Sequence, residues 1–312
     1  MTDDLSSVTP SGLADSPPGK RRCRRLLGAG ALSLVLVIGL VAGNGWSSDW
    51  ATPRASTTSH APRRARVAGV RVVAYNLAKL SAVRALPLRS VGEVEAHLDE
   101  IAALLRGLDP DIVVLSEAVV ECTACDVNQV EYLARATGMH AWAFGENMNF
   151  GLPFFRLRSG NAVLSRFPLR PLANVQLSGT RPILWPANNR RILWCETLIN
   201  GAWVRVGSVH NDSFDPDNNA VQVQEILDQL GQEAAILAGD FNAKPRDSQI
   251  RALRDSGKFA GEFEGAFTAP ADVPVVRIDY VLAPAAWSHV ETVVVASDES
   301  DHRPVVAEFR IE

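Results

Sequence analysis

The chain has 312 residues, of which 47% are hydrophobic and 21% are charged. This composition excludes a disordered chain, a coiled coil and a collagen-like fibre, and the length allows either two domains or one large α/β domain. The net charge of −4 is unevenly spread, because residues 1–66 carry +5 and the rest of the chain carries −9. The two parts are therefore expected to meet different partners.

The first predicted element is a membrane-spanning helix at residues 26–43. These eighteen residues contain no charge, and five basic residues precede them at positions 20–25. At about 1.5 Å per residue they span roughly 27 Å, which is enough for a bilayer core. The positive residues predict a cytoplasmic tail at 1–25 and an extracytoplasmic C-terminal part. Small residues at 41–43 and the pair Arg24-Arg25 leave open an export signal cleaved near Gly43, which would release a secreted protein.

Residues 44–66 are rich in Ser, Thr, Ala, Pro and Arg and predict a flexible linker. From residue 67 onward, strand-like and helix-like stretches alternate. Strands are predicted at 70–75, 112–115, 162–165, 191–199, 203–209, 235–238, 275–282, 290–295 and 305–311, and helices at 91–108, 127–137, 220–230 and 248–255. Many strands with few long helices predict one α/β domain at 67–312, with two sheets packed together and the helices outside.

Acid, amide and imidazole side chains stand at the ends of these predicted strands. They are Asn76, Glu117, His210, Asp240, Asn242, Asp279, Asp301 and His302. Each alone is typical of a turn, a helix cap or a buried histidine, but the whole set at strand ends indicates side chains directed into one cleft. Carboxylate and amide oxygens favour Mg²⁺ or Mn²⁺ over zinc, and such an ion points to a phosphate-ester substrate.

Seven short segments of the domain contain these residues. They are Tyr75-Asn76, Leu-Ser-Glu at 115–117, Gly-Asn-Ala-Val-Leu-Ser-Arg-Phe-Pro at 160–168, Val209-His210, Gly-Asp-Phe-Asn at 239–242, Arg-Ile-Asp-Tyr at 277–280 and Ser-Asp-His-Arg-Pro-Val at 300–305. In order and approximate spacing they resemble the endonuclease/exonuclease/phosphatase superfamily, in its deoxyribonuclease-like and sphingomyelinase-like branches. The resemblance covers residues 67–312. It implies a four-layer α/β/β/α sandwich of two packed, mostly antiparallel sheets with the active site at their rim.

The resemblance also implies a metal site. Glu117 is similar to the principal ligand of Mg²⁺ or Mn²⁺ in the family, and Asn76 and Asp301 would help to hold the ion or its waters. The residue before this glutamate is often Gln in the family and is Ser116 here, a change that could alter the support of the ligand without removing it.

Five further residues receive catalytic roles from the resemblance. Asp240 and Asn242 look like the pair that positions or activates the attacking water and the scissile phosphate. Asp279 would orient His302, which would act as general acid or base or as a phosphate contact. His210 resembles the second catalytic imidazole of the two branches, and it favours cleavage of phosphodiesters.

A loop at residues 179–191 is the predicted substrate contact. Its candidate side chains are Arg181, Trp185, Arg190 and Arg191, which could bind a phosphate and an adjoining ring or lipid group. The alternative is a surface loop with a buried Trp and solvated arginines. Asn211 follows His210 where the sphingomyelinase branch commonly has Leu, so the substrate of that branch does not carry over.

The cysteines offer a second possible site. Cys122-Thr-Ala-Cys125 has the spacing of a zinc half-site or a redox pair, but no second such motif completes a zinc site. Outside the cytoplasm, we expect a local disulfide in the loop after Glu117, and Cys195 as a small buried residue.

Together these features predict an extracytoplasmic, Mg²⁺-dependent phosphohydrolase, foremost a phosphodiesterase, attached to the cell membrane through residues 26–43. A secreted or surface nuclease is one alternative, although a domain at −9 does not favour binding of a nucleic acid. A phosphomonoesterase for a small phosphorylated substrate is another, and a non-catalytic binding module is a third. The substrate and the oligomeric state stay open.

Overall fold

The computed structural model describes residues 30–37, 39, 51–62, 69–81, 90–123, 125–152, 155–179 and 189–311. The chain divides into two units, Met1–Gly39 and Leu40–Glu312. In the first unit, residues 30–37 and 39 are helical, while the rest of the predicted span at 26–43 and the predicted tail at 1–25 lie outside the described residues. No described helix has both the length and the apolar character that crossing a membrane requires.

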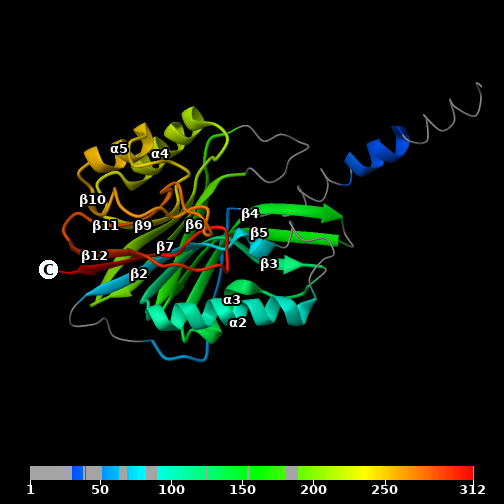
Figure 1. The fold of residues 1–312 in the computed structure, drawn as a ribbon, viewed down its shortest axis with the longest axis horizontal. Helices are drawn as coiled ribbons and strands as arrows, with labels where there is room; N and C mark the ends of the chain where they lie inside the picture. The colour runs from blue at the N-terminus through cyan, green and yellow to red at the C-terminus, as the bar shows by residue number, and fades with distance from the viewer. Residues whose placement is uncertain are drawn as a thin grey trace, which may run out of the picture. The chain divides into compact units, whose positions relative to one another are not determined.

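The second unit contains two mixed β-sheets (Figure 1). The seven-stranded sheet has the order β1-β4-β5-β3-β2-β13-β12 and consists of β1 (Arg54–Thr57), β2 (Val70–Asn76), β3 (Ile112–Cys122), β4 (Ala141–Leu152), β5 (Phe155–Ser165), β12 (Ser288–Val294) and β13 (Val305–Arg310). The six-stranded sheet has the order β10-β11-β9-β8-β7-β6 and consists of β6 (Leu169–Gln176), β7 (Arg191–Ile199), β8 (Ala202–His210), β9 (Ala235–Asp240), β10 (Phe259–Gly261) and β11 (Asp279–Pro284). Among the described strands, each sheet has one parallel pair, β2–β3 and β8–β9, and the other pairs are antiparallel, as predicted.

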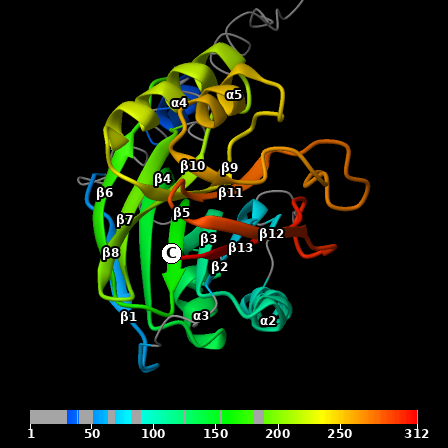
Figure 2. The same cartoon turned by 90° about the vertical axis from the view of Figure 1, so that its left-hand side faces the viewer.

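Alternation of side chains along the central strands builds a four-layer sandwich. In β3, Val113 and Leu115 pack against the helices of one face, whereas Ile112 and Val114 pack against the other sheet. Helices α2 (Val91–Leu108) and α3 (Gln129–Ala136) cover the seven-stranded sheet, and α4 (Pro216–Leu230) and α5 (Ser248–Asp255) cover the six-stranded sheet (Figures 1 and 2). The predicted α/β/β/α architecture is therefore confirmed.

Local capping signals explain why α2 has its predicted bounds. Ser90 Oγ accepts a hydrogen bond from the Glu93 backbone N–H, and the Glu93 carboxylate accepts one from the Ser90 N–H, which forms a capping box. At the other end, Asp109 adopts a left-handed conformation with φ of 47°, and Pro110 prevents the helix from continuing. Such signals can be identified in the sequence, so the predicted and observed helices coincide.

Four strands, β1, β4, β6 and β10, were not predicted. Strand β4 contains Gly145, Asn147 and Asn149, residue types with low strand propensity. Pairing with β5 along its whole length holds it, and a Cβ at Gly160 of β5 would collide with the Gly145 carbonyl oxygen. Tertiary pairing therefore makes β4 a strand where local propensity does not.

The predicted flexible linker is wrong for residues 51–62. Strand β1 within this segment pairs antiparallel with β4 and forms one edge of the seven-stranded sheet. Beyond it, Thr58 Oγ1 donates to the carbonyl oxygen of Met139 at 2.5 Å, and the His60 ring contacts the Arg135 carbonyl oxygen at 3.0 Å. The segment is ordered because the exposed edge of β4 offers backbone partners that composition alone does not reveal.

The expected disulfide between Cys122 and Cys125 is not formed. Both side chains are buried free thiols, as is Cys195. Burial, and the neighbouring Cys122, raise the pKa of Cys125 to about 12. Cys195 is the small buried residue that the sequence predicted, whereas Cys122 and Cys125 contribute to the core as thiols.

Candidate active site

The strand register brings three predicted catalytic residues into one row. His210 at the end of β8 lies opposite Asp240 at the end of β9, and Asp240 lies opposite Asp279 at the start of β11. In the other sheet, Asn76 ends β2, and its side-chain Nδ2 donates a hydrogen bond to Asp240 Oδ2 at 3.0 Å. The rims of both sheets therefore contribute to one site.

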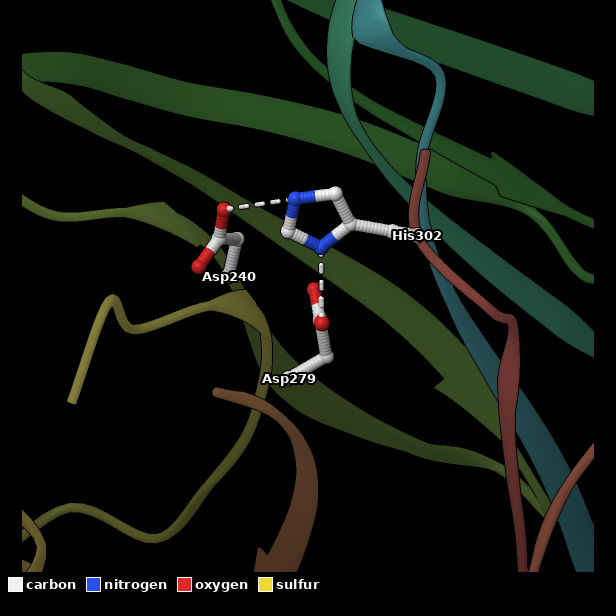
Figure 3. A group of neighbouring side chains, drawn as sticks. All are labelled: Asp240, Asp279 and His302. Atoms are coloured by element: carbon white, nitrogen blue, oxygen red, sulfur yellow. Dashed lines mark hydrogen bonds and ion pairs between the residues drawn. The ribbon is translucent and has the colours of Figure 1, made fainter. Parts of the chain in front are cut away.

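Asp240 contacts two histidines, and Figure 3 shows one of them, His302, whose ring lies between Asp240 and Asp279. Asp240 Oδ2 lies 3.7 Å from His210 Nε2 and 3.8 Å from His302 Nε2, and Asp240 Oδ1 accepts a hydrogen bond from the Asn242 backbone N–H at 2.9 Å. The side chain is 2% exposed. Burial, reinforced by the negative charge of Asp279, raises the pKa of Asp240 to about 7. This carboxylate is therefore much more basic than an exposed one.

Asp279 and His302 form a hydrogen-bonded pair. His302 Nδ1 lies 2.8 Å from Asp279 Oδ2, and the Asp279 backbone N–H donates to Thr268 Oγ1 at 3.3 Å, which fixes the start of β11. Burial disfavours the charged ring, but the Asp279 carboxylate outweighs it and raises the pKa of His302 to about 10. The pair leaves Nε2 of His302 directed at Asp240, as the prediction that Asp279 orients His302 requires.

Glu117 reaches the site because β3 is irregular at this position. The register of β3 against β5 shifts between Leu115 and Ala118, and Glu117 has a left-handed φ of 57°, rare outside glycine. Its Oε1 atom lies 3.7 Å from His210 Nε2, and its Oε2 atom forms an ion pair with the ammonium group of Lys79. The strained backbone at Glu117 thus places its carboxylate in the site.

Ser116, the departure from the family pattern, has a supporting role. Its Oγ donates to the Val209 carbonyl oxygen at 3.1 Å, and Ser208 Oγ donates to the Leu115 carbonyl oxygen at 3.2 Å. These buried bonds connect β3 of one sheet to β8 of the other beside Glu117 and His210. Ser116 therefore helps to join the strand that carries Glu117 to the strand that carries His210.

Burial and nearby charges decide the charge state of His210, and the residue that follows it holds Asn242. Burial, with the positive charges of Arg190 and Lys79, keeps the pKa of His210 well below its usual value, so the ring is neutral. Asn242, with φ of 48°, donates from Nδ2 to the Asn211 carbonyl oxygen at 3.1 Å. The backbone carbonyl of Asn211 thus fixes the amide of Asn242.

Asp301 lies at the edge of the site. Its Oδ1 atom is 4.0 Å from His302 Nε2, and its side chain is 31% exposed. The neighbouring Ser300 donates from Oγ to the Asn76 carbonyl oxygen at 2.6 Å, which ties this loop to the end of β2. Asn76 Oδ1 already accepts a hydrogen bond from the Ala78 N–H at 2.9 Å, which leaves it one lone pair for an ion or its water.

The donor set fits a hard divalent cation. The Glu117 side chain is 22% exposed, so it is partly accessible, and its carboxylate already pairs with a cation, the ammonium group of Lys79. Asp240, Asp279 and His302 also have candidate ligand atoms within 4.8 Å of one another. In this second group, Asp279 and His302 are already hydrogen-bonded to each other, which explains why they lie close together. Glu117 is therefore the better first ligand for the ion.

The two neighbouring arginines of the predicted substrate loop point in different directions. Arg190 is buried, donates from Nη2 to Ser213 Oγ at 3.1 Å, and lies in the field of Asp240 and Glu117. Its Nε has no hydrogen-bond partner among the described residues. Arg191 instead donates to strand β6, from Nη1 to the Asn174 carbonyl oxygen at 2.8 Å. The prediction of a substrate contact therefore suits Arg190 and is wrong for Arg191, whose side chain serves the sheet.

Two of the predicted substrate contacts lie outside the described residues, and one residue of the site, Lys79, was not predicted. Arg181 and Trp185 lie outside the described residues. Lys79 was missed by the sequence analysis, although it stands only three positions after Asn76. No pattern marks it, because its contact with Glu117 depends on left-handed backbone at Lys79 and Glu117.

The sequence profile of the Endonuclease/Exonuclease/phosphatase family matches residues 73–302, and the chain belongs to this family. Members of the family are hydrolases that act on phosphate esters. No match is found among curated proteins.

Solved structures of the family share the fold at low sequence identity. The endonuclease/exonuclease/phosphatase from Beutenbergia cavernae DSM 12333 is 22% identical, with a TM-score of 0.62, and the match covers 78% of this chain and 72% of that one. A mannosyl-6-phosphatase from Bacteroides thetaiotaomicron VPI-5482 is 18% identical, with a TM-score of 0.56 and coverage of 77% and 99%. Sphingomyelinase C from Streptomyces griseocarneus is 20% identical, with a TM-score of 0.50 and coverage of 77% and 99%. The last two are named for different substrates, and at these identities similarity establishes the fold alone.

Proposed function

We propose that the protein hydrolyses phosphodiester bonds by metal-assisted attack of water. The observation that carries the proposal is the position of Asp240, whose Oδ2 lies 3.7 Å and 3.8 Å from Nε2 of two different histidines. One carboxylate and two imidazoles around one point provide the proton acceptor and donor that a diester displacement needs. The presence of His210 favours a diester over a monoester, because a second imidazole at this position resembles the deoxyribonuclease-like and sphingomyelinase-like branches.

Each residue of the site then has a defined task. Asp240, held by Asn76 and by the Asn242 backbone, accepts the proton of the attacking water. His302, oriented by Asp279, contacts the phosphoryl oxygen or protonates the leaving oxygen. Glu117 would hold Mg²⁺ or Mn²⁺, and the bound ion supplies neutralisation of charge on the phosphoryl oxygens. Arg190, whose guanidinium lies in the field of Asp240 and Glu117, binds the phosphate.

Replacing Arg190 and Arg191 by Met in turn distinguishes phosphate binding from stabilisation of the sheet. We expect Arg190→Met to lower kcat/KM on bis-p-nitrophenyl phosphate by about 10- to 100-fold, because a charge-assisted bond to the phosphate is lost. Arg191→Met should leave kcat/KM unchanged but lower the free energy of unfolding by about 1–3 kcal/mol, since its hydrogen bonds to β6 disappear. Steady-state kinetics and urea unfolding measure both effects. Equal kinetic losses for the two variants would contradict the assignment of Arg190.

A substrate panel tests the proposed reaction class. The full chain with Mn²⁺ should cleave bis-p-nitrophenyl phosphate faster than p-nitrophenyl phosphate, and the panel extends to plasmid DNA, RNA, sphingomyelin, phosphoinositides and sugar phosphates. A preference for monoesters would replace the proposal by a phosphomonoesterase. Turnover on nucleic acid alone would narrow the proposal to a nuclease, and no turnover on any member would favour a binding module.

We also propose that the catalytic domain works outside the cytoplasm, attached to the membrane through residues 26–43. The support is the uncharged run itself, preceded by basic residues at 20–25. Protease added to intact cells should then digest the domain, and membranes washed with salt should retain it. Recovery of the protein in the cytoplasm would refute this location, and release of a chain shortened near Gly43 would indicate secretion.

A further inference from the structure

The turn that follows Asn76 places a lysine on the candidate metal ligand. Residues 78–81 form a short 3-10 turn, in which Ala78 and Lys79 both have left-handed φ values, 46° and 53°. Two hydrogen bonds hold the entry to this turn: Leu77 N–H donates to the Ser116 carbonyl oxygen at 2.9 Å, and Ala78 N–H donates to Asn76 Oδ1. The turn is therefore fixed against the residue that directly precedes Glu117.

The ion pair between Lys79 and Glu117 is partly shielded from water. The two side chains are 20% and 22% exposed, which is less than in typical surface pairs such as Arg135 with Glu131, at 69% and 38%. Partial burial strengthens the attraction and reduces its screening by salt. A lysine side chain loses considerable conformational freedom when it forms such a pair. The fixed turn directs Lys79 to one carboxylate and so favours this pair over a solvated lysine.

We propose that Lys79 is an internal competitor of the divalent cation, which occupies Glu117 when no ion is bound and lowers the affinity of the site for the ion. This inference rests on the proposed function, because it requires Glu117 to be the metal ligand. The ammonium group and an ion cannot share Glu117 Oε2 at contact distance, and their charges repel each other. Binding of the ion therefore includes the free energy of breaking the ion pair.

Removal of the lysine charge should strengthen binding of the ion. The probe is Mn²⁺, titrated at fixed pH into the metal-free full-length chain, with free Mn²⁺ measured by electron paramagnetic resonance. Lys79→Met, which keeps the length of the side chain without its charge, should bind Mn²⁺ at least about tenfold more tightly than the unchanged protein. Lys79→Arg, which keeps the charge, should bind close to the unchanged protein. Lys258→Met is the control, because Lys258 contacts the Gly231 carbonyl oxygen and no residue of the site.

Thermal unfolding gives a second measurement that does not depend on activity. Mn²⁺ should raise the Tm of Lys79→Met more than that of the unchanged protein, since tighter binding to the folded state gives more stabilisation at the same ion concentration. Equal or weaker Mn²⁺ binding by Lys79→Met would overturn the inference. If the KM for bis-p-nitrophenyl phosphate also rose, Lys79 would be a phosphate contact.

The Glu117→Gln variant distinguishes failure of this inference from failure of the proposed metal site. If Glu117→Gln loses Mn²⁺ binding while Lys79→Met binds like the unchanged protein, Glu117 is a ligand but Lys79 does not compete, and this inference alone is wrong. If Glu117→Gln binds Mn²⁺ like the unchanged protein, the ion does not use Glu117, and both are wrong. Lost binding in Glu117→Gln with tightened binding in Lys79→Met supports both.

Discussion

Replacing Asp240 with Asn is expected to lower kcat on bis-p-nitrophenyl phosphate by about 10²- to 10⁴-fold, the range for loss of a general base. The amide cannot accept the proton of the attacking water. Its oxygen can still accept the hydrogen bond from the Asn242 N–H, so the fold retains this contact. Steady-state kinetics at saturating Mn²⁺ measures the loss, and circular dichroism is expected to show a Tm within a few degrees of the unchanged protein.

The control for this substitution is Asp255→Asn. Asp255 is an exposed carboxylate at the end of α5, so the same chemical change there should leave kcat unaltered. If Asp240→Asn kept more than about a tenth of the original kcat, a general base at Asp240 would be excluded.

The second large effect concerns the pair formed by Asp279 and His302. His302→Asn removes the imidazole but keeps an amide nitrogen that can donate to Asp279, and it should lower kcat by about 10²- to 10⁴-fold. Asp279→Asn should lower kcat by less, because the ring remains but its orientation and charge are no longer fixed. Asp279 is a positioning residue, since it acts through His302.

A double-mutant cycle tests this dependence. With His302 already replaced, the further change Asp279→Asn should have almost no effect on kcat, because there is no ring left to orient. Additive losses in the double variant would mean that Asp279 acts independently of His302. The dependence of kcat on pH gives another readout for Asp279→Asn with His302 intact. If Asp279 acts through His302, this profile should shift, whereas a merely structural role would lower the stability and leave the profile in place.

Local signals in the sequence account for the elements that were predicted well. The capping box at Ser90 and the stop at Asp109-Pro110 fix α2 from neighbouring residues alone. The central strands have continuous apolar runs because both of their faces are buried, as in β3. Motifs that end such strands could be placed at one rim before the structure was known, and the register of Asp240 with His210 and Asp279 agrees with this.

Features that depend on tertiary pairing were missed. Strand β4 carries Gly and Asn residues and exists through its pairing with β5, and β1 completes that edge although its composition is typical of a linker. The same limit applies to side-chain direction. Arg190 and Arg191 are equivalent in the sequence, and only alternation at the start of β7 decides that the first reaches the site and the second reaches β6.

Lys79 illustrates a different limit. Lysine after a strand is common and usually solvated, so the residue type carries no signal. Its role follows from two non-glycine residues with left-handed backbone, Lys79 and Glu117, which bring the ammonium group and the carboxylate into contact. Such conformations concentrate at functional sites because the surrounding structure must stabilise them.

The most direct test of the account is the rate of bis-p-nitrophenyl phosphate hydrolysis by the full chain before and after removal of metal. We expect EDTA to abolish turnover and added Mn²⁺ or Mg²⁺ to restore it, whereas Glu117→Gln should remain inactive at ion concentrations that saturate the unchanged protein. Full activity in excess EDTA, or full activity of Glu117→Gln with the same ion requirement, would contradict a metal-assisted phosphodiesterase centred on Glu117 and Asp240.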